Sequence, residues 1–128
     1  MKVLLIDDDE DLMTIFTTAL KQEQFETVYD LTGQGGLDKA KTEKPDVILL
    51  DQVLPDISGN DVLQKLKADE ATKNIPVILL SNFSQEDLVK NAIDLGAVDY
   101  VYKYQVEPKD VIAKVREAFN NKTDETAK

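Results

Sequence analysis

The chain has 128 residues, the size of one ordinary domain, and it is 42% hydrophobic and 31% charged, which is the balance of a soluble globular protein. Its net charge of −10 argues against nucleic acid and anionic membranes as partners, because both are bound through Lys and Arg. The absence of cysteine excludes disulfides and thiolate catalysis, and the absence of histidine excludes a phosphohistidine on this chain.

The two ends of the chain bear on its location and its domain organisation. A strand pattern starts within two residues of the N-terminus, which leaves no room for a signal peptide, and the apolar runs are far shorter than the roughly 20 residues of a membrane-spanning helix. We therefore expect a cytoplasmic protein. We also expect one domain over residues 1–120, then a polar, disordered tail at residues 121–128, with no second domain attached.

Strand and helix patterns alternate along the chain. Short apolar runs predict five strands, at residues 2–6, 25–29, 46–50, 75–80 and 98–102. Apolar residues at helical spacing predict helices at residues 10–22, 32–44, 60–67 and 84–95, and a last helix opened by Pro108. At the fourth helix, Ser84 and Asp87 have capping-box spacing, and Gly96 stands where a C-cap glycine is expected.

This alternation predicts an α/β fold: a doubly wound, five-stranded parallel sheet with helices on both faces. Four of the strands are almost purely apolar, which is typical of strands buried on both faces. The strand at 25–29 alternates instead and therefore belongs at an edge. The pattern favours the strand order 2-1-3-4-5, in which the first and third strands flank the point where the winding direction reverses.

Polar side chains follow the carboxyl ends of four strands. Asp7 and Asp8 follow the first strand, Asp51 the third, Ser81 the fourth and Lys103 the fifth. Because parallel strands end at one edge of the sheet, and ligands bind there, we expect these groups to converge. Clustered carboxylates repel one another unless a hard cation joins them, so the cluster predicts bound Mg²⁺. A serine and a lysine beside Mg²⁺ suit a phosphoryl group.

At this point the sequence resembles the response-regulator receiver domains of the CheY-like type, over residues 2–120. The motifs that carry the resemblance occur in the family's order: Asp7-Asp8-Asp9, Leu50-Asp51, Leu54-Pro55, Gly59, Ser81, Gly96-Ala97, Tyr100 and Lys103. Each motif is weak alone, but together they are specific. The resemblance implies a flavodoxin-like (CheY-like) fold, in agreement with the strand order derived above.

The resemblance also implies roles for the acidic residues. In that family the aspartate after the third strand accepts a phosphoryl group from the phosphohistidine of a histidine kinase or histidine phosphotransfer protein, and here that residue is Asp51. Asp8 would bind Mg²⁺ directly and Asp7 would assist. The main-chain carbonyl of Val53 would be a further ligand. The chain would thus be a phosphoacceptor that catalyses its own phosphorylation and dephosphorylation, rather than an enzyme.

By the same resemblance, Ser81 and Lys103 would hold phosphoryl oxygens, and Ser81 and Tyr100 would form a switch. Movement of Ser81 toward the phosphoryl group would leave space for Tyr100, a bistable packing change. The change would remodel the surface of the fourth helix, fifth strand and fifth helix, which would bind a downstream target protein. We expect a monomer or a phosphorylation-dependent homodimer.

One departure from the family pattern favours a second function. The family usually places proline after the lysine, often through a cis bond, and here Tyr104 follows Lys103. A cis bond before a residue other than proline costs about 2.5–4 kcal/mol, so we expect a trans bond. The alternative is a degenerate binding module that keeps the fold and no longer depends on phosphorylation.

Two further alternatives come from other classes. A small Mg²⁺-dependent aspartyl phosphatase, similar to the haloacid-dehalogenase superfamily, would use Asp7 as nucleophile and Asp9 as its paired acid, but the chain lacks a later acidic pair after Lys103. In the receiver interpretation, Asp9 instead begins the first helix. A flavin-binding protein would need a phosphate-binding loop after the first strand, where three aspartates stand.

Overall fold

The computed structural model describes residues 1–81 and 86–127, with the side chains of residues 86, 88 and 122–127 left out. The strands are β1 (Lys2–Ile6), β2 (Glu26–Asp30), β3 (Val47–Asp51), β4 (Val77–Ser81) and β5 (Asp99–Tyr102). The helices are α1 (Glu10–Gln22), α2 (Gly33–Thr42), α3 (Gly59–Ala68), α4 (Glu86–Asp94) and α5 (Pro108–Ala127). All strand pairs are parallel, in the order β2-β1-β3-β4-β5, which confirms the predicted fold class and strand order.

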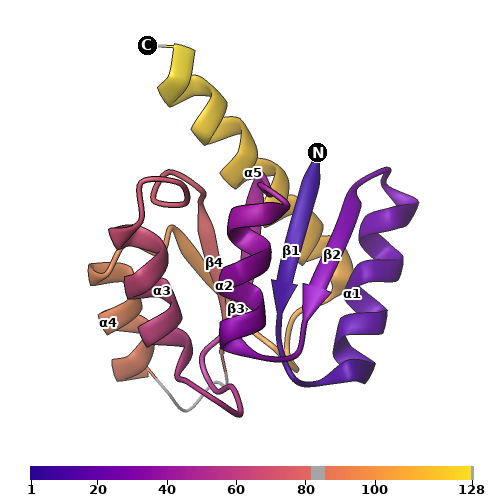
Figure 1. The fold of residues 1–128 in the computed structure, drawn as a ribbon. Helices are drawn as coiled ribbons and strands as arrows, with labels where there is room; N and C mark the ends of the chain where they lie inside the picture. The colour runs from indigo at the N-terminus through magenta and orange to yellow at the C-terminus, as the bar shows by residue number, and fades with distance from the viewer. Residues whose placement is uncertain (82–85, 128) are drawn as a thin grey trace.

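The helices cover both faces of the sheet, with α1 and α5 on one face and α2, α3 and α4 on the other (Figure 1). Successive strand residues point to opposite faces. Val3 and Leu5 of β1 pack in the core beneath α1 and α5, whereas Leu4 and Ile6 pack in the core beneath α2 and α3. Burial on both faces therefore explains the apolar runs of β1, β3 and β4, whereas β5 lies at the other edge of the sheet and has only one buried residue.

Strand β2 lies at one edge of the sheet, as its alternating sequence predicted. It contains no buried residue, while every residue of β3 and β4 is buried. Phe25, which the sequence placed in this strand, precedes it and packs instead in the core formed with α1 and α5.

Side chains and glycine set the helix ends. Asp9 caps α1, with its carboxylate accepting a 3.1 Å hydrogen bond from the Leu12 N–H, as expected. Gly96 follows α4 with a φ of +112°, a left-handed conformation that favours glycine. Ser84, the expected cap of α4, lies outside the described residues. The backbone of α5 continues to Ala127, and the disordered tail at 121–128 stays a prediction.

Glycine is also required where α3 begins. A Cβ on Gly59 would collide with the carbonyl oxygen of Asp51, so the first turn of α3 packs directly against the end of β3. The N–H of Gly59 donates to the carbonyl of Gln52 at 2.8 Å. These contacts fix the position of the segment that follows β3.

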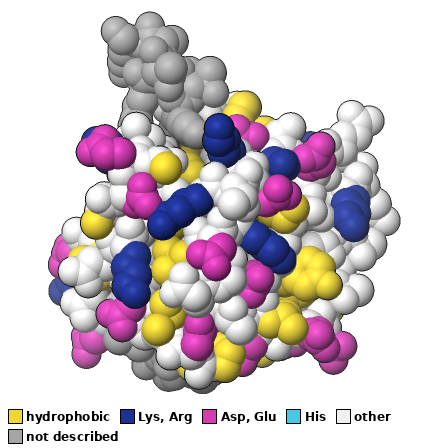
Figure 2. Space-filling view, in the orientation of Figure 1, with side chains coloured by type: hydrophobic (Ala, Val, Ile, Leu, Met, Phe, Trp, Pro, Cys, Tyr) yellow, Lys and Arg dark blue, Asp and Glu magenta, His cyan; other side chains and the backbone are white. Residues whose placement is uncertain are grey.

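The surface carries charges of both signs. On the face that bears α2 and α3, Figure 2 shows Lys and Arg side chains interspersed with Asp and Glu rather than gathered by sign. Of the helices in residues 1–81 and 86–127, none is long and apolar enough to cross a lipid bilayer.

Candidate functional site

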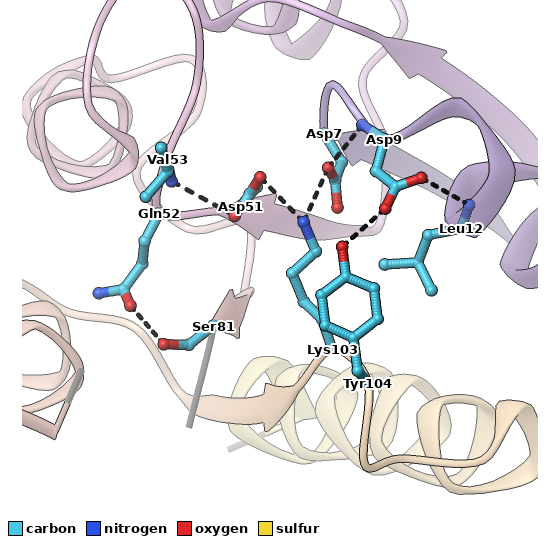
Figure 3. Close-up of polar contacts among 9 residues, drawn as sticks. All are labelled: Asp7, Asp9, Leu12, Asp51, Gln52, Val53, Ser81, Lys103 and Tyr104. Carbon is cyan, nitrogen blue, oxygen red and sulfur yellow. Dashed lines mark hydrogen bonds and ion pairs between the residues drawn. The ribbon is translucent and has the colours of Figure 1, made fainter. Parts of the chain in front are cut away.

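The central strands bring the acidic residues together. Ile6 of β1 pairs with Leu50 of β3, so Asp7 and Asp51 follow at the same level of the sheet, where the winding direction reverses. The N–H of Lys103 donates to the carbonyl of Ser81 at 2.9 Å, which extends the register of β5 and β4 to this edge. The predicted convergence of these residues is visible in Figure 3.

Lys103 lies between two carboxylates. Its Nζ is 3.1 Å from Asp7 Oδ1 and 3.1 Å from Asp51 Oδ2, and all three side chains are buried. Burial alone would lower the pKa of Lys103, but the charges of Asp51 and Asp7 together raise it. The lysine is therefore held as an ammonium ion at the acidic edge.

The pKa of the Asp51 carboxyl is raised far above its usual value. Burial, and then the negative charge of Asp7, raise its pKa from 3.8 to about 7, against the opposing effects of Lys103 and the Val53 N–H. That N–H donates to Asp51 Oδ1 at 3.3 Å. A further cation nearby would lower the pKa of Asp51, because positive charge stabilises the ionised carboxylate.

A divalent cation fits the acidic cluster. Asp7, Asp8 and Asp51 each offer an oxygen, and these three oxygens lie within 4.8 Å of one another. Asp7 Oδ2 is buried and, among the described residues, has no hydrogen-bond partner, an arrangement that a metal ion would satisfy. Asp8 is exposed and so leaves the cluster open to solvent. All these donors are oxygens, the ligands that Mg²⁺ prefers.

Ser81 forms a contact that the sequence analysis did not predict. Its hydroxyl donates a 2.6 Å hydrogen bond to Gln52 Oε1, and both residues are buried. Gln52 belongs to none of the motifs used above. One signal could have located it: it directly follows Asp51, whose register partner Leu80 directly precedes Ser81.

Tyr104 also makes contacts that the sequence analysis missed. Its hydroxyl donates to Asp9 Oδ2 at 2.7 Å, and its ring centroid lies 5.7 Å from Lys103 Nζ (Figure 3). The described residues contain no cis peptide bond, so the bond before Tyr104 is trans, as expected. Lys103 reaches both carboxylates with tyrosine, rather than proline, after it.

Tyr100 lies on β5, opposite Leu79 of β4, and is 37% exposed. Its ring meets that of Tyr102 edge-on, with centroids 5.4 Å apart. The Val53 side chain is 54% exposed. The roles predicted for Tyr100 as a switch residue and for the Val53 carbonyl as a metal ligand stay predictions.

A parallel sheet of this order, with clustered aspartates, a buried lysine and a serine at its carboxyl edge, defines a receiver-type signalling domain. Residues 3–116 match the model of the response regulator receiver domain, and the chain belongs to this family. It is similar in structure to a CheY-like response regulator receiver domain protein from Methanospirillum hungatei. The TM-score is 0.89 at 25% identity, over 97% of each chain.

Longer curated proteins share the same domain. The chain is 33% identical to the DNA-binding response regulator MtrA of Mycolicibacterium smegmatis, over 98% of this chain and 54% of MtrA. It is 32% identical to the alkaline phosphatase synthesis transcriptional regulatory protein PhoP of Bacillus subtilis, over 90% of this chain and 47% of PhoP. The chain thus spans about half the length of these relatives, and the expectation of a stand-alone receiver stays a prediction.

Proposed function

We propose that Asp51 accepts a phosphoryl group from the phosphohistidine of a histidine kinase or histidine phosphotransfer protein, in a reaction that depends on Mg²⁺. The observation that carries this proposal is the 3.1 Å approach of the buried Lys103 ammonium to Asp51, beside two further aspartates. It supports the proposal because positive charge lies beside the proposed nucleophile, next to carboxylates that would hold a cation.

The chemistry is a transfer between two nucleophiles. A carboxylate oxygen of Asp51 attacks phosphorus, the phosphorus–nitrogen bond breaks, and imidazole leaves with the electron pair. Lys103 offsets the negative charge that the carboxylate and the phosphoryl oxygens bring together. Mg²⁺, held by Asp7, Asp8, Asp51 and the Val53 carbonyl, would neutralise charge on these carboxylates and on the transferred group.

In this proposal the reaction changes a binding surface and releases no metabolite. We therefore propose that the chain is a phosphoacceptor protein that catalyses its own phosphorylation and dephosphorylation. In this proposal Ser81 and Tyr100 respond to the phosphoryl group and remodel the surface of α4, β5 and α5. That surface would bind a downstream protein or a second copy of the chain. The net charge of −10 supports protein rather than nucleic acid as the partner of this domain. We propose that the domain acts in the cytoplasm.

Intact-mass spectrometry after incubation with acetyl phosphate tests the proposal. We expect one phosphoryl adduct on the wild type with Mg²⁺, none after removal of Mg²⁺ by EDTA, and none on Asp51→Asn. An adduct that persists in Asp51→Asn and disappears in Asp7→Asn would support the phosphatase alternative. A wild type that accepts no phosphoryl group from acetyl phosphate or from a phosphorylated histidine phosphotransfer domain would support the phosphorylation-independent module.

A further inference from the structure

The bond between Ser81 and Gln52 joins the ends of two neighbouring strands. Ser81 is the last residue of β4, and Gln52 directly follows Asp51 at the end of β3 (Figure 3). A serine hydroxyl has one proton to donate, and here it goes to Gln52 Oε1 at 2.6 Å. In this arrangement the proton is not available to a group on Asp51.

Three further contacts hold Gln52 in place. Its N–H donates to the Leu80 carbonyl at 3.2 Å, its carbonyl accepts from the Gly59 N–H at 2.8 Å, and its Nε2 donates to Asn60 Oδ1 at 3.4 Å. Its amide oxygen is therefore held toward Ser81 by the sheet on one side and by the start of α3 on the other. The residue is 4% exposed, so water does not readily replace the Ser81 hydroxyl.

We propose that Gln52 is a positioning residue that holds Ser81 in the unphosphorylated arrangement and so sets how readily the switch operates. The inference rests on the proposed function, because the competing acceptor is a phosphoryl oxygen on Asp51. Engaging that oxygen breaks the bond to the amide and leaves Gln52 Oε1 buried without its donor, which is a cost. The new bond to a charged oxygen is stronger than the bond to a neutral amide, so the exchange proceeds.

Removal of the amide acceptor should therefore favour the phosphoryl-bound arrangement. Gln52→Met keeps the length of the side chain and lacks the strong acceptor. Beryllium fluoride, added with Mg²⁺, serves as the phosphoryl mimic. We expect Gln52→Met to bind beryllium fluoride about two- to tenfold more tightly than the wild type does, the factor that corresponds to one net hydrogen bond. Gln64→Met, at an exposed position on α3, is the matched control and should bind as the wild type does.

A double-mutant cycle separates positioning from a general structural effect. The affinity for beryllium fluoride is measured for the wild type, Gln52→Met, Ser81→Ala and the double variant. If Gln52 acts through Ser81, its substitution changes the affinity in the wild-type background and leaves it unchanged in the Ser81→Ala background. Unfolding by urea, without any ligand, gives the coupling between the two side chains for the same four proteins.

The outcomes distinguish the inference from the function on which it depends. Three results would overturn the role of Gln52 and leave the proposal for Asp51 intact. They are equal affinities of the wild type and Gln52→Met for beryllium fluoride, an equal gain in affinity in the wild-type and Ser81→Ala backgrounds, and no coupling free energy between the two side chains in urea unfolding. A wild type that neither binds the mimic nor accepts a phosphoryl group would overturn both. If Gln52→Met does not fold, Gln52→Leu completes the same cycle.

Discussion

The hydroxyl of Tyr104 donates a 2.7 Å hydrogen bond to Oδ2 of Asp9, and this bond joins the segment after β5 to the N-cap of α1. The bond from Tyr104, and then that from the Leu12 N–H, hold the pKa of Asp9 below its usual value of 3.8. The Tyr104 ring at the same time lies beside the Lys103 ammonium. One exposed tyrosine therefore contacts both the helix cap and the buried lysine of the site.

Tyr104→Phe should raise the pKa of Asp9 toward 3.8. A carboxyl whose pKa is lowered on folding stabilises the folded state above pH 3.8, and this stabilisation is lost as the pH falls through the folded-state pKa. The wild type should therefore be more stable than the variant at pH 7 but not at acid pH. The difference should be less than about 1 kcal/mol, because the pair is exposed. NMR titration of Asp9 checks this, with Tyr29→Phe as control; an unchanged Asp9 would contradict it.

Asp51→Asn should stabilise the protein in the absence of Mg²⁺, and more at pH 8 than at pH 5. The pKa of Asp51 rises from 3.8 in the unfolded chain to about 7 when folded, so the wild type loses stability as pH rises through this window, and asparagine does not titrate. We expect a gain of roughly 1–3 kcal/mol at pH 8. Urea unfolding measures it, with the exposed Asp38→Asn as control. A gain independent of pH would argue against a raised pKa.

Mg²⁺ should bind more tightly as pH rises toward 7 and should change little above it. Binding requires ionised carboxylates, and the pKa of Asp51 is about 7, so below this pH the ion must displace a proton. The affinity should fall by up to about tenfold for each pH unit. Calorimetric titration of EDTA-treated protein at several pH values measures this. Asp8→Asn should weaken binding at every pH, and an affinity independent of pH would contradict the prediction.

Lys103→Met should destabilise the protein by about 3–5 kcal/mol, because it leaves Asp7 and Asp51 buried without their cation. The loss should be larger at pH 8 than at pH 5, since Lys103 lowers the pKa of Asp51 and its removal raises that pKa further. Urea unfolding at both pH values tests this. Lys114→Met, which breaks a half-exposed pair with Asp99, should cost less than about 1 kcal/mol.

Mg²⁺ supplies a second test of the same lysine. Because a bound cation would replace part of the missing charge, added Mg²⁺ should stabilise Lys103→Met more than it stabilises the wild type. An equal response in the two proteins would show that Lys103 and the metal do not act on the same carboxylates.

The sequence predicted the convergence of Asp7, Asp51 and Lys103 because that convergence depends on the backbone. Apolar runs define the strands, parallel strands end at one edge, and the residue that follows each strand is then placed. The alternating pattern of residues 25–29 likewise identified one of the two edge strands, with a shift of one residue. These features are fixed by periodicity, which a sequence shows directly.

The contacts of Gln52 and Tyr104 could not be predicted in the same way. Each joins side chains at the ends of separate elements, and which groups meet depends on rotamers and on loop paths rather than on a repeating pattern. Gln52 resembles any polar residue after a strand, although it is buried. Tyr104 stood out only as a departure from the proline of the family, which says nothing of its bond to Asp9.

The collision that any side chain on Gly59 would make with the Asp51 carbonyl has a mechanical consequence. Because the two backbones are in direct contact, the beginning of α3 and the end of β3 should move together as one rigid segment. The Ser81 hydroxyl, by contrast, contacts that segment through a side-chain hydrogen bond to Gln52, which a change of partner can break. A change of partner at Ser81 therefore need not move the start of α3, and a disturbance at Asp51 should travel toward α4 and β5.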